Sequence, residues 1–240
     1  MADETPRSFS DRLAVQPDKP AELVAAATVI LLRDSDDGLE TLMLRKNSKI
    51  AFGGMWVFPG GRIDDDDGSP DDPMEERARL AAVREAEEEA SLDLDPDGLV
   101  WFSHWTPPPV EIRRFSTWFF AAPAPSSEVT IDDGEITDSR WLSPRAALDQ
   151  QREGEIELVP PTFVTLHYLQ PYDTAAEALA GLGGDGLRRY VTQIGKGDEG
   201  MVVMWEGDAG YDARDPNLPG ARHRLTMSKQ GYHFDDSGVA

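Results

Sequence analysis

Residues 84–92 read REAEEEASL, and this stretch decides the fold of the chain. It ends a segment, residues 75–90, that is rich in Ala, Glu, Arg and Leu and that follows Pro73, a residue tolerated at the start of a helix. The segment therefore predicts an α-helix. Upstream stands FPGG at residues 58–61, in a run dense in Gly, Pro and Asp that predicts a loop with a tight Pro-Gly turn.

Three glutamates of the predicted helix, Glu85, Glu88 and Glu89, are three and four residues apart and so share one face. Their like charges repel, and a bound divalent cation would reverse that repulsion. Clustered hard oxygen ligands suit Mg²⁺ or Mn²⁺. Arg84 stands four residues before Glu88 and can pair with it. In a chain with 45 acidic residues, the same face could also be an ordinary solvated acidic surface.

The rest of the chain alternates short apolar runs with helical segments. The predicted strands are residues 25–32, 40–45, 99–105, 115–122 and one that ends at 141–142. The predicted helices after the first are residues 143–148, 160–169 and 175–182. We expect residues 1–20 to form a flexible tail, residues 21–184 the main domain with its C-terminal helices, and residues 185–240 a small β-rich extension.

Composition excludes several classes of function. The 240 residues carry 23 Lys and Arg against 45 Asp and Glu, a net charge of −22. Such a chain is repelled by phosphate backbones and anionic lipid, so we expect no nucleic-acid and no membrane partner. There is no cysteine, which removes thiolate ligands and thiol nucleophiles. We find no apolar run long enough for a membrane span and no signal-peptide core, and we therefore expect a cytoplasmic protein.

The two quoted stretches together resemble the signature of the Nudix hydrolases, G-x5-E-x7-R-E-U-x-E-E-x-G-U, in which U is aliphatic. Gly61 matches the first glycine of the pattern. The charged positions of its second half are matched one for one by Arg84, Glu85, Glu88 and Glu89. Ala86 and Leu92 fill the two aliphatic positions, and Ser91 stands where the pattern has glycine.

The spacing departs from the pattern. Arg84 stands 23 positions after Gly61, where the pattern has 14, so nine residues are additional. Either Asp67 or Glu76 can then take the place of the middle glutamate. Asp67 keeps the spacing to the glycine, and Glu76 keeps the spacing to the arginine.

Further stretches resemble a narrower branch, which includes the coenzyme A and acyl-coenzyme A diphosphatases. They are TPPPVEIRRFSTWFF at 106–120, ITDSRWLSPRAAL at 136–148 and VPPTFVTL at 159–166. This resemblance runs from about residue 22 to about residue 170.

The resemblance implies an α/β (α+β) fold, an α/β/α sandwich around a mixed sheet. It also implies dependence on Mg²⁺ (or Mn²⁺) and cleavage of the diphosphate bond of a small nucleotide, a nucleoside diphosphate linked to another group. A coenzyme A-like substrate is favoured. A dinucleoside polyphosphate or nucleotide-sugar hydrolase and a non-catalytic nucleotide-sensing module remain alternatives, and a homodimer is compatible with the sequence.

On this resemblance, Glu88 and Glu89 are the first metal ligands, and Glu85 is a third ligand or the general base. Arg84 orients Glu88, and Gly61 offers its backbone carbonyl to the metal or lets the turn close.

Residues outside the helix are further candidates. Glu135, in a later acidic loop, is an alternative base or ligand, or else an ordinary acidic turn residue. We expect Arg62, Arg113, Arg114 and Phe115 to contact the substrate. The adjacent arginines could grip a phosphate, or else form salt bridges with nearby acidic residues.

Overall fold

A computed structural model of the chain describes residues 21–48, 52–109, 114–126, 128–132 and 134–239. The chain divides into two compact units. The large unit consists of Ala25–Trp105 and Phe115–Arg189. The small unit has 190–239 as its main described segment. The predicted domain boundaries at residues 20 and 184 stay predictions.

An eight-stranded sheet forms the centre of the large unit. Its strands follow the order β3-β2-β1-β6-β5-β8, with β4 paired to β1 and β7 paired to β2. The strands are β1 (Leu23–Ser35), β2 (Gly38–Lys46), β3 (Trp56–Val57), β4 (Gly60–Arg62), β5 (Val100–Thr106), β6 (Arg114–Pro123), β7 (Ile136–Leu142) and β8 (Arg188–Val191). The first two predicted strands, residues 25–32 and 40–45, are confirmed as parts of β1 and β2, which pair in antiparallel fashion through the turn between them.

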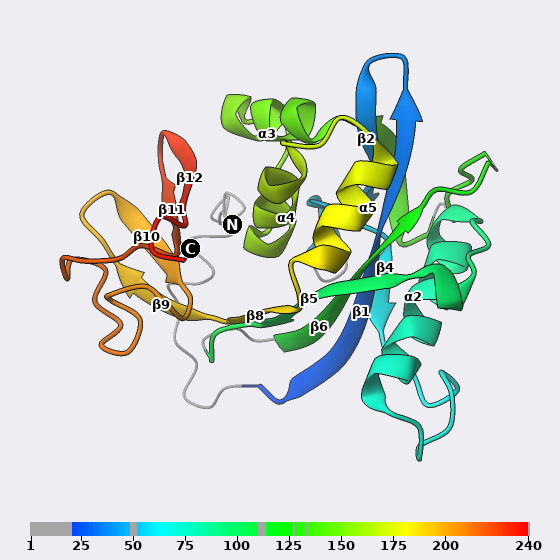
Figure 1. Ribbon diagram of the computed structural model, residues 1–240, viewed down its shortest axis with the longest axis horizontal. Coiled ribbons are helices and arrows are strands. Elements are labelled where there is room, and N and C mark those ends of the chain that lie inside the picture. The colour runs from blue at the N-terminus through cyan, green and yellow to red at the C-terminus, as the bar shows by residue number, and fades with distance from the viewer. Residues whose placement is uncertain (1–20, 49–51, 110–113, 127, 133, 240) are drawn as a thin grey trace, which may run out of the picture. The chain divides into compact units, whose positions relative to one another are not determined.

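Helices cover both faces of this sheet. Figure 1 shows α2 on one side of the sheet and α3, α4 and α5 on the other, which confirms the expected α/β/α sandwich. The helices are α2 (Met74–Ala90), α3 (Pro144–Glu153), α4 (Pro160–Leu169) and α5 (Ala175–Gly184), with a short 3-10 helix η1 at Pro96–Gly98. Each helix predicted from the sequence is confirmed, with ends that differ by a few residues at most.

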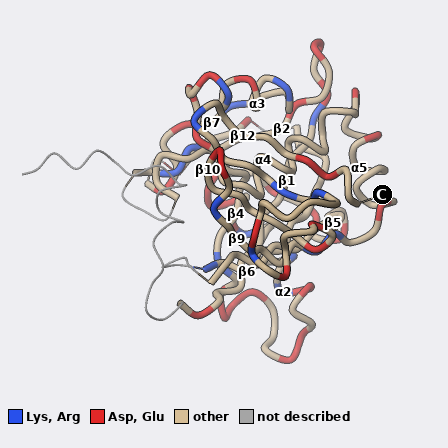
Figure 2. The backbone as a smooth tube through the Cα atoms, turned by 90° about the vertical axis from the view of Figure 1, so that its left-hand side faces the viewer, with Lys and Arg blue, Asp and Glu red and all other residues tan. Residues whose placement is uncertain are grey.

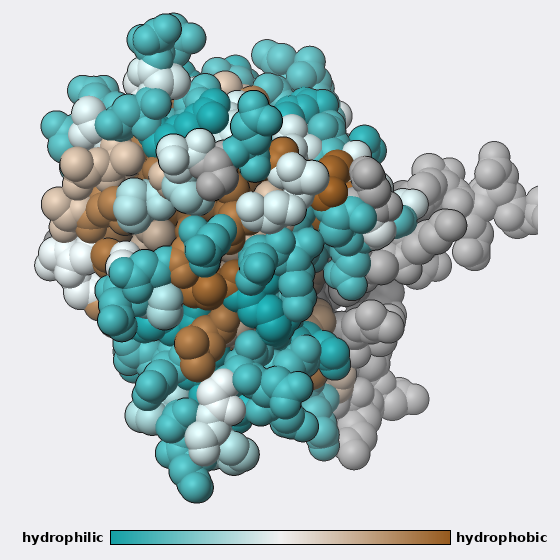
Figure 3. Space-filling model, turned by 90° about the vertical axis from the view of Figure 1, so that its right-hand side faces the viewer, coloured by the Kyte–Doolittle hydropathy of each residue, from teal (hydrophilic) through white to brown (hydrophobic). Residues whose placement is uncertain are grey.

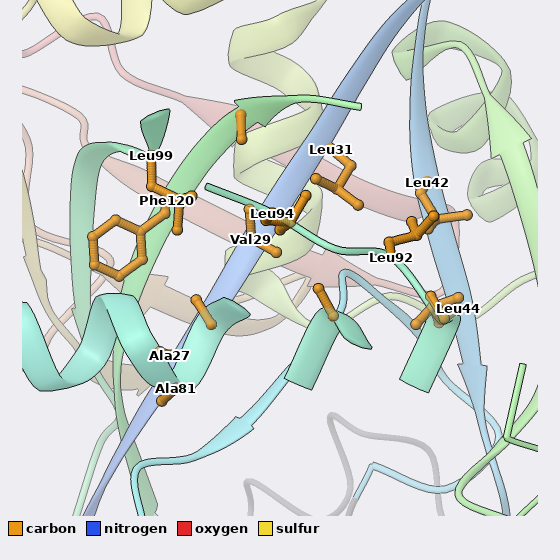
Figure 4. Close-up of a cluster of buried hydrophobic side chains, with 14 of the residues drawn as sticks. Ala27, Val29, Leu31, Leu42, Leu44, Ala81, Leu92, Leu94, Leu99 and Phe120 are labelled. Carbon is orange, nitrogen blue, oxygen red and sulfur yellow. The ribbon is translucent and has the colours of Figure 1, made fainter. Parts of the chain in front are cut away.

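The apolar run in β1 is continuous because both faces of the strand are covered. Residues 26–32 are all buried, and alternate side chains point to opposite faces. The face toward α2 contributes to one cluster of buried side chains (Figure 4). Its members on the two central strands are Ala27, Val29, Leu31, Leu42 and Leu44. Helix α2 meets this face with five buried alanines, whose small side chains let the helix lie close to the sheet.

The prediction that FPGG lies in a loop was wrong for its last two residues. Gly60, Gly61 and Arg62 form strand β4, which pairs with residues 26–28 of β1 in antiparallel register. A side chain added at Gly60 would collide with the backbone of Thr28, so glycine allows this close pairing. Glycine has low strand propensity, and the local sequence therefore favoured a loop; the tertiary pairing overrides that preference.

The C-terminal end of α2 has a serine, in a left-handed conformation, where the signature has glycine. Ser91 caps the helix in the left-handed conformation, with φ 56° and ψ 38°. Glycine adopts this conformation without the cost of roughly 1 kcal/mol that other residues pay. The Ser91 hydroxyl donates a hydrogen bond to the carbonyl of Thr130 at 3.0 Å, which ties the helix end to the loop before β7.

The small unit contains a second, antiparallel sheet in the order β12-β11-β10-β9. Its strands are β9 (Gln193–Lys196), β10 (Gly200–Met204), β11 (Arg224–Ser228) and β12 (Gly231–Asp235). A buried ion pair joins Arg224 to Asp208, whose carboxylate also accepts the backbone N–H groups of Gly210 and His223. This strand content agrees with the β-rich character predicted for the C-terminal segment.

The described helices and the distribution of charge can be compared with the expectations from composition. Among the described helices, none has the length and apolar character needed to cross a membrane. Figure 2 shows Asp and Glu on many parts of the chain, with fewer Lys and Arg. A Lys or Arg side chain that lies among carboxylates therefore marks a place where negative charge is balanced locally.

Candidate active site

Helix α2 and strand β4 form the site together. Ala82 and Ala86 are buried, so the turns of α2 that carry the glutamates lie against the sheet. A side chain added at Gly61 would collide with the carboxyl group of Glu85. Glycine at this position therefore makes room for a carboxylate beside the backbone of β4. The face of the molecule that carries α2 is mainly hydrophilic, with smaller apolar areas between polar side chains (Figure 3).

The three glutamates of the signature have different environments. The exposed fractions of their side chains are 13% for Glu85, 59% for Glu88 and 4% for Glu89. Glu85 and Glu89 turn toward the sheet, one helical turn apart, whereas Glu88 faces solvent. The helix thus places two carboxylates inside the fold and a third at its surface.

Glu89 is held by two groups from the sheet. One carboxylate oxygen, Oε2, accepts the backbone N–H of Gly60 at 2.9 Å. The other, Oε1, pairs with the ammonium group of Lys46, which is itself buried. Lys46 is not among the site residues predicted from the sequence. A signal was available, because Lys46 continues the alternation of Leu42 and Leu44 and therefore faces the same helix.

Arg84 connects the acidic groups of the site. Its guanidinium binds both carboxylate oxygens of Asp67, at 2.9 and 2.8 Å. It also donates to the carboxylates of Glu85 and Glu88, each at 3.0 Å, and to the backbone carbonyl of Arg62 at 2.9 Å. The Arg84–Glu88 contact lies at the spacing that the helix predicts. Arg84 thus connects helix α2 to the segment that precedes it.

Asp67 and Glu76, the two candidates for the middle position of the signature, have different surroundings. Asp67 is buried and binds Arg84, whereas Glu76 is exposed on the first turn of α2. Burial opposes ionisation of Asp67, but hydrogen bonds from Arg84 and from the backbone of Asp64 outweigh it and lower its pKa. Arg77 donates to the carbonyls of Asp64 and Asp67 and so anchors the inserted loop.

Glu135 lies near the same cluster. Its Oε2 is 3.9 Å from the ammonium nitrogen of Lys46. The Asp132 side chain accepts the backbone N–H groups of Glu135 and Ile136, and Asn47 donates its backbone N–H to the carbonyl of Glu135. The loop before β7 is therefore fixed at the end of β2, with the Glu135 carboxylate beside Lys46.

The expected substrate contacts have varied surroundings. Arg62 is exposed at the edge of the cluster, 3.5 Å from Asp64. Arg114 belongs to the small unit, where its guanidinium donates to the carbonyls of Pro107, Pro108 and Ala21. The ring of Phe115 lies 5.9 Å from that of Phe52. Arg113 lies outside the described residues.

The two inward glutamates resist ionisation. Burial, and then the charge of Glu89, raise the pKa of Glu85 to about 7, although Arg84 and Lys46 oppose the shift. Burial also raises the pKa of Glu89, and the nearby charge of Glu135 adds to this, against the lowering effect of Lys46 and of the Gly60 N–H. A divalent cation beside these carboxylates would favour their charged forms.

The donor chemistry fits a hard cation. Glu85 and Glu89 offer carboxylate oxygens beside strand β4, and the exposed carboxylates of Glu88 and Glu135 lie nearby. Within the described part of the chain, no three acidic or histidine side chains are already gathered around one point.

In metal-free protein, we expect the free energy of unfolding to fall as the pH rises from about 5 to 7. The folded state raises the pKa of Glu85 from 4.5 to about 7, so it binds the proton more tightly than the unfolded state. Stability is therefore highest below the unfolded pKa and declines up to the folded pKa, by about 1–3 kcal/mol for Glu85 after allowance for solvent screening. Urea denaturation in EDTA at several pH values measures this decline. The decline should be smaller in Glu85→Gln. If the free energy of unfolding fell equally with pH in the two proteins, Glu85 would not be its cause.

Comparison with known proteins gives a family and two relatives. The sequence model described as NUDIX domain matches residues 22–161. Acyl-coenzyme A diphosphatase NUDT19 of Xenopus laevis is 28% identical over 137 residues, which are 54% of this chain and 36% of that protein. The chain thus matches only about a third of the length of this relative. The crystal structure of a NUDIX hydrolase from Alicyclobacillus acidocaldarius superposes with a TM-score of 0.60 and 22% identity, over 67% of this chain and 96% of that one. This second likeness concerns the fold alone.

Proposed function

The chain belongs to the NUDIX domain family, and we propose that it is a hydrolase dependent on Mg²⁺ (or Mn²⁺) that cleaves the diphosphate bond of a nucleoside diphosphate linked to another group. A coenzyme A-like substrate is favoured, because the sequence resembles that branch over residues 106–166 and a relative carries that activity in its name. The observation that carries the proposal is a pair of carboxylates facing the glycines of β4, with Glu89 buried and Glu85 mostly covered.

Glu88 and Glu89 would hold the cation, with Glu85 as a third ligand or the general base and with the backbone carbonyl of Gly61 as a further oxygen donor. When bound, a divalent cation neutralises charge on phosphate oxygens. It would also let so acidic a chain accept an anionic substrate.

The chain's own residues would supply proton transfer and orientation. Glu85 would accept the proton of the attacking water if it is the base, because its carboxylate lies within the cluster, beside Gly61. Glu135 is the alternative base, because its carboxylate is exposed and lies beside the cluster. Arg84 keeps Glu85 and Glu88 in place, and the exposed Arg62 is placed to bind an outer phosphate. Attack of water on one phosphorus would break its bond to the bridging oxygen and release two phosphate-bearing products.

A substrate panel tests the proposal. Coenzyme A, acyl-coenzyme A, NAD-type nucleotides, dinucleoside polyphosphates and nucleotide-sugars would each be incubated with the protein, with Mg²⁺ or with EDTA, and the products separated by chromatography. We expect two phosphate-bearing products from the coenzyme A compounds, with Mg²⁺ only. Faster cleavage of another class would correct the substrate. Binding without products would support a sensing module, and equal turnover in EDTA would contradict the role of the metal.

A further inference from the structure

Lys46 is a buried cation in the middle of the acidic site. It is the last residue of β2, and it lies on the face of the strand that Leu42 and Leu44 present to α2. Because Leu42 and Leu44 are apolar and buried, an apolar residue would be expected at the next position on this face of β2. Burial of a lysine is costly unless its charge is paired, so the neighbours of Lys46 indicate why a lysine stands there.

Three separate segments converge on this ammonium group. It pairs with Glu89 of α2, lies 3.5 Å from the carbonyl oxygen of Gly60 in β4, and lies 3.9 Å from Glu135 in the loop before β7. These are two carboxylates and one backbone carbonyl, which are oxygen donors of the kind that a hard cation prefers. Lys46 thus has the surroundings of a cation site.

The contacts of Glu89 imply that Lys46 and a bound divalent cation would compete for its carboxylate. One of its oxygens accepts the Gly60 N–H and the other is engaged by Lys46. A divalent cation that binds Glu89 in this buried place would meet the positive charge of Lys46 at close range, where repulsion is strong because solvent screens little. The cation and the ammonium group therefore cannot both occupy the present position beside Glu89.

We infer that Lys46 is an internal counter-ion that occupies the place of the divalent cation beside Glu89 and is displaced when the cation binds. This inference rests on the proposed function, because it takes Glu89 as a metal ligand. Lys46 then has two effects. It keeps a buried carboxylate paired in the metal-free protein, and it lowers the affinity for the cation, because the ion pair must be broken first.

The direction of the affinity change separates this role from a purely structural one. If Lys46 only supported Glu89 in the correct geometry, its removal would leave the metal site poorly formed and weaken binding. If Lys46 competes with the cation, its removal leaves Glu89 buried and unpaired, and the cation becomes the group that compensates it.

The experiment measures Mn²⁺ affinity in the absence of substrate, by electron paramagnetic resonance of free Mn²⁺ or by calorimetry. We expect Lys46→Met to bind Mn²⁺ about tenfold or more tightly than the unmodified chain. The matched control is Arg33→Met, which removes one positive charge from an exposed pair with Glu40 in the same unit and should leave the affinity unchanged. Thermal melting adds a second readout, because Mn²⁺ should raise the Tm of Lys46→Met more than that of the unmodified chain. Lys46→Gln serves as a second, polar variant.

The outcomes separate the inference from the function on which it rests. If the unmodified chain binds Mn²⁺ and the Lys46 variants bind it equally or more weakly, the counter-ion role is overturned and the proposed function stands. The role is also overturned if both variants stay unfolded in saturating Mn²⁺, since the cation then does not replace the ammonium. If neither the unmodified chain nor the variants bind Mn²⁺, the metal dependence and the inference both fail.

Discussion

Replacement of Glu89 by glutamine should lower the rate of metal-dependent hydrolysis by at least about a hundredfold. The carboxylate of Glu89 is buried between the Gly60 N–H and Lys46, so its charge is enclosed by protein and little screened by solvent. Glutamine has nearly the same shape and can still accept the Gly60 N–H. What it removes is the negative charge that would hold a cation, and kcat with saturating Mg²⁺ measures that loss.

The single substitution also leaves Lys46 without its main partner, which should reduce stability. The double variant Glu89→Gln/Lys46→Met separates the two effects, because it removes both charges at once. We expect the double variant to regain stability in urea denaturation and to remain inactive. Glu87→Gln is the matched control, since it makes the same change at an exposed position of the same helix. A Glu89→Gln protein that is folded and turns over at a near-normal rate would remove Glu89 from the mechanism.

The helix and the contacts between its own side chains could be predicted from the sequence because both depend on local spacing. Helical periodicity alone places Glu85 and Glu89 one turn apart and brings Arg84 to Glu88. Helical periodicity does not determine which of these side chains faces the sheet. That depends on the packing of the alanine stripe, which buries Glu89 and leaves Glu88 in solvent.

The features that the sequence did not reveal depend on contacts between distant segments. Strand β4 exists because β1 provides a pairing partner for Gly60, although the local sequence favours a loop. The choice between Asp67 and Glu76 was open because the insertion satisfies either spacing. It is decided by Arg77, which fixes the loop through two backbone carbonyls, and by Gly68, whose φ of 75° suits the turn after Asp67.

The network around Arg84 should be the most sensitive part of the site to loss of stability. We expect Arg84→Met to lower the free energy of unfolding by about 3 kcal/mol, which is the order of cost for removing one partner of a buried ion pair. The reason is Asp67, whose side chain is only 4% exposed and would lose both of its hydrogen bonds from the guanidinium. Urea denaturation at pH 7 measures the effect.

Two further variants identify Asp67 as the cause. Adding Asp67→Asn to Arg84→Met should recover part of the stability, because the buried group is then neutral and can still accept the backbone N–H of Asp64. Arg84→Lys should recover less, since an ammonium group cannot bind both oxygens of Asp67 while reaching Glu85 and Glu88. Arg152→Met, which removes an exposed pair with Asp149 on α3, is the control and should change stability by less than about 0.5 kcal/mol. If Arg84→Met were no more destabilising than this surface control, Asp67 would not depend on the arginine, and the loop would be held by Arg77 alone.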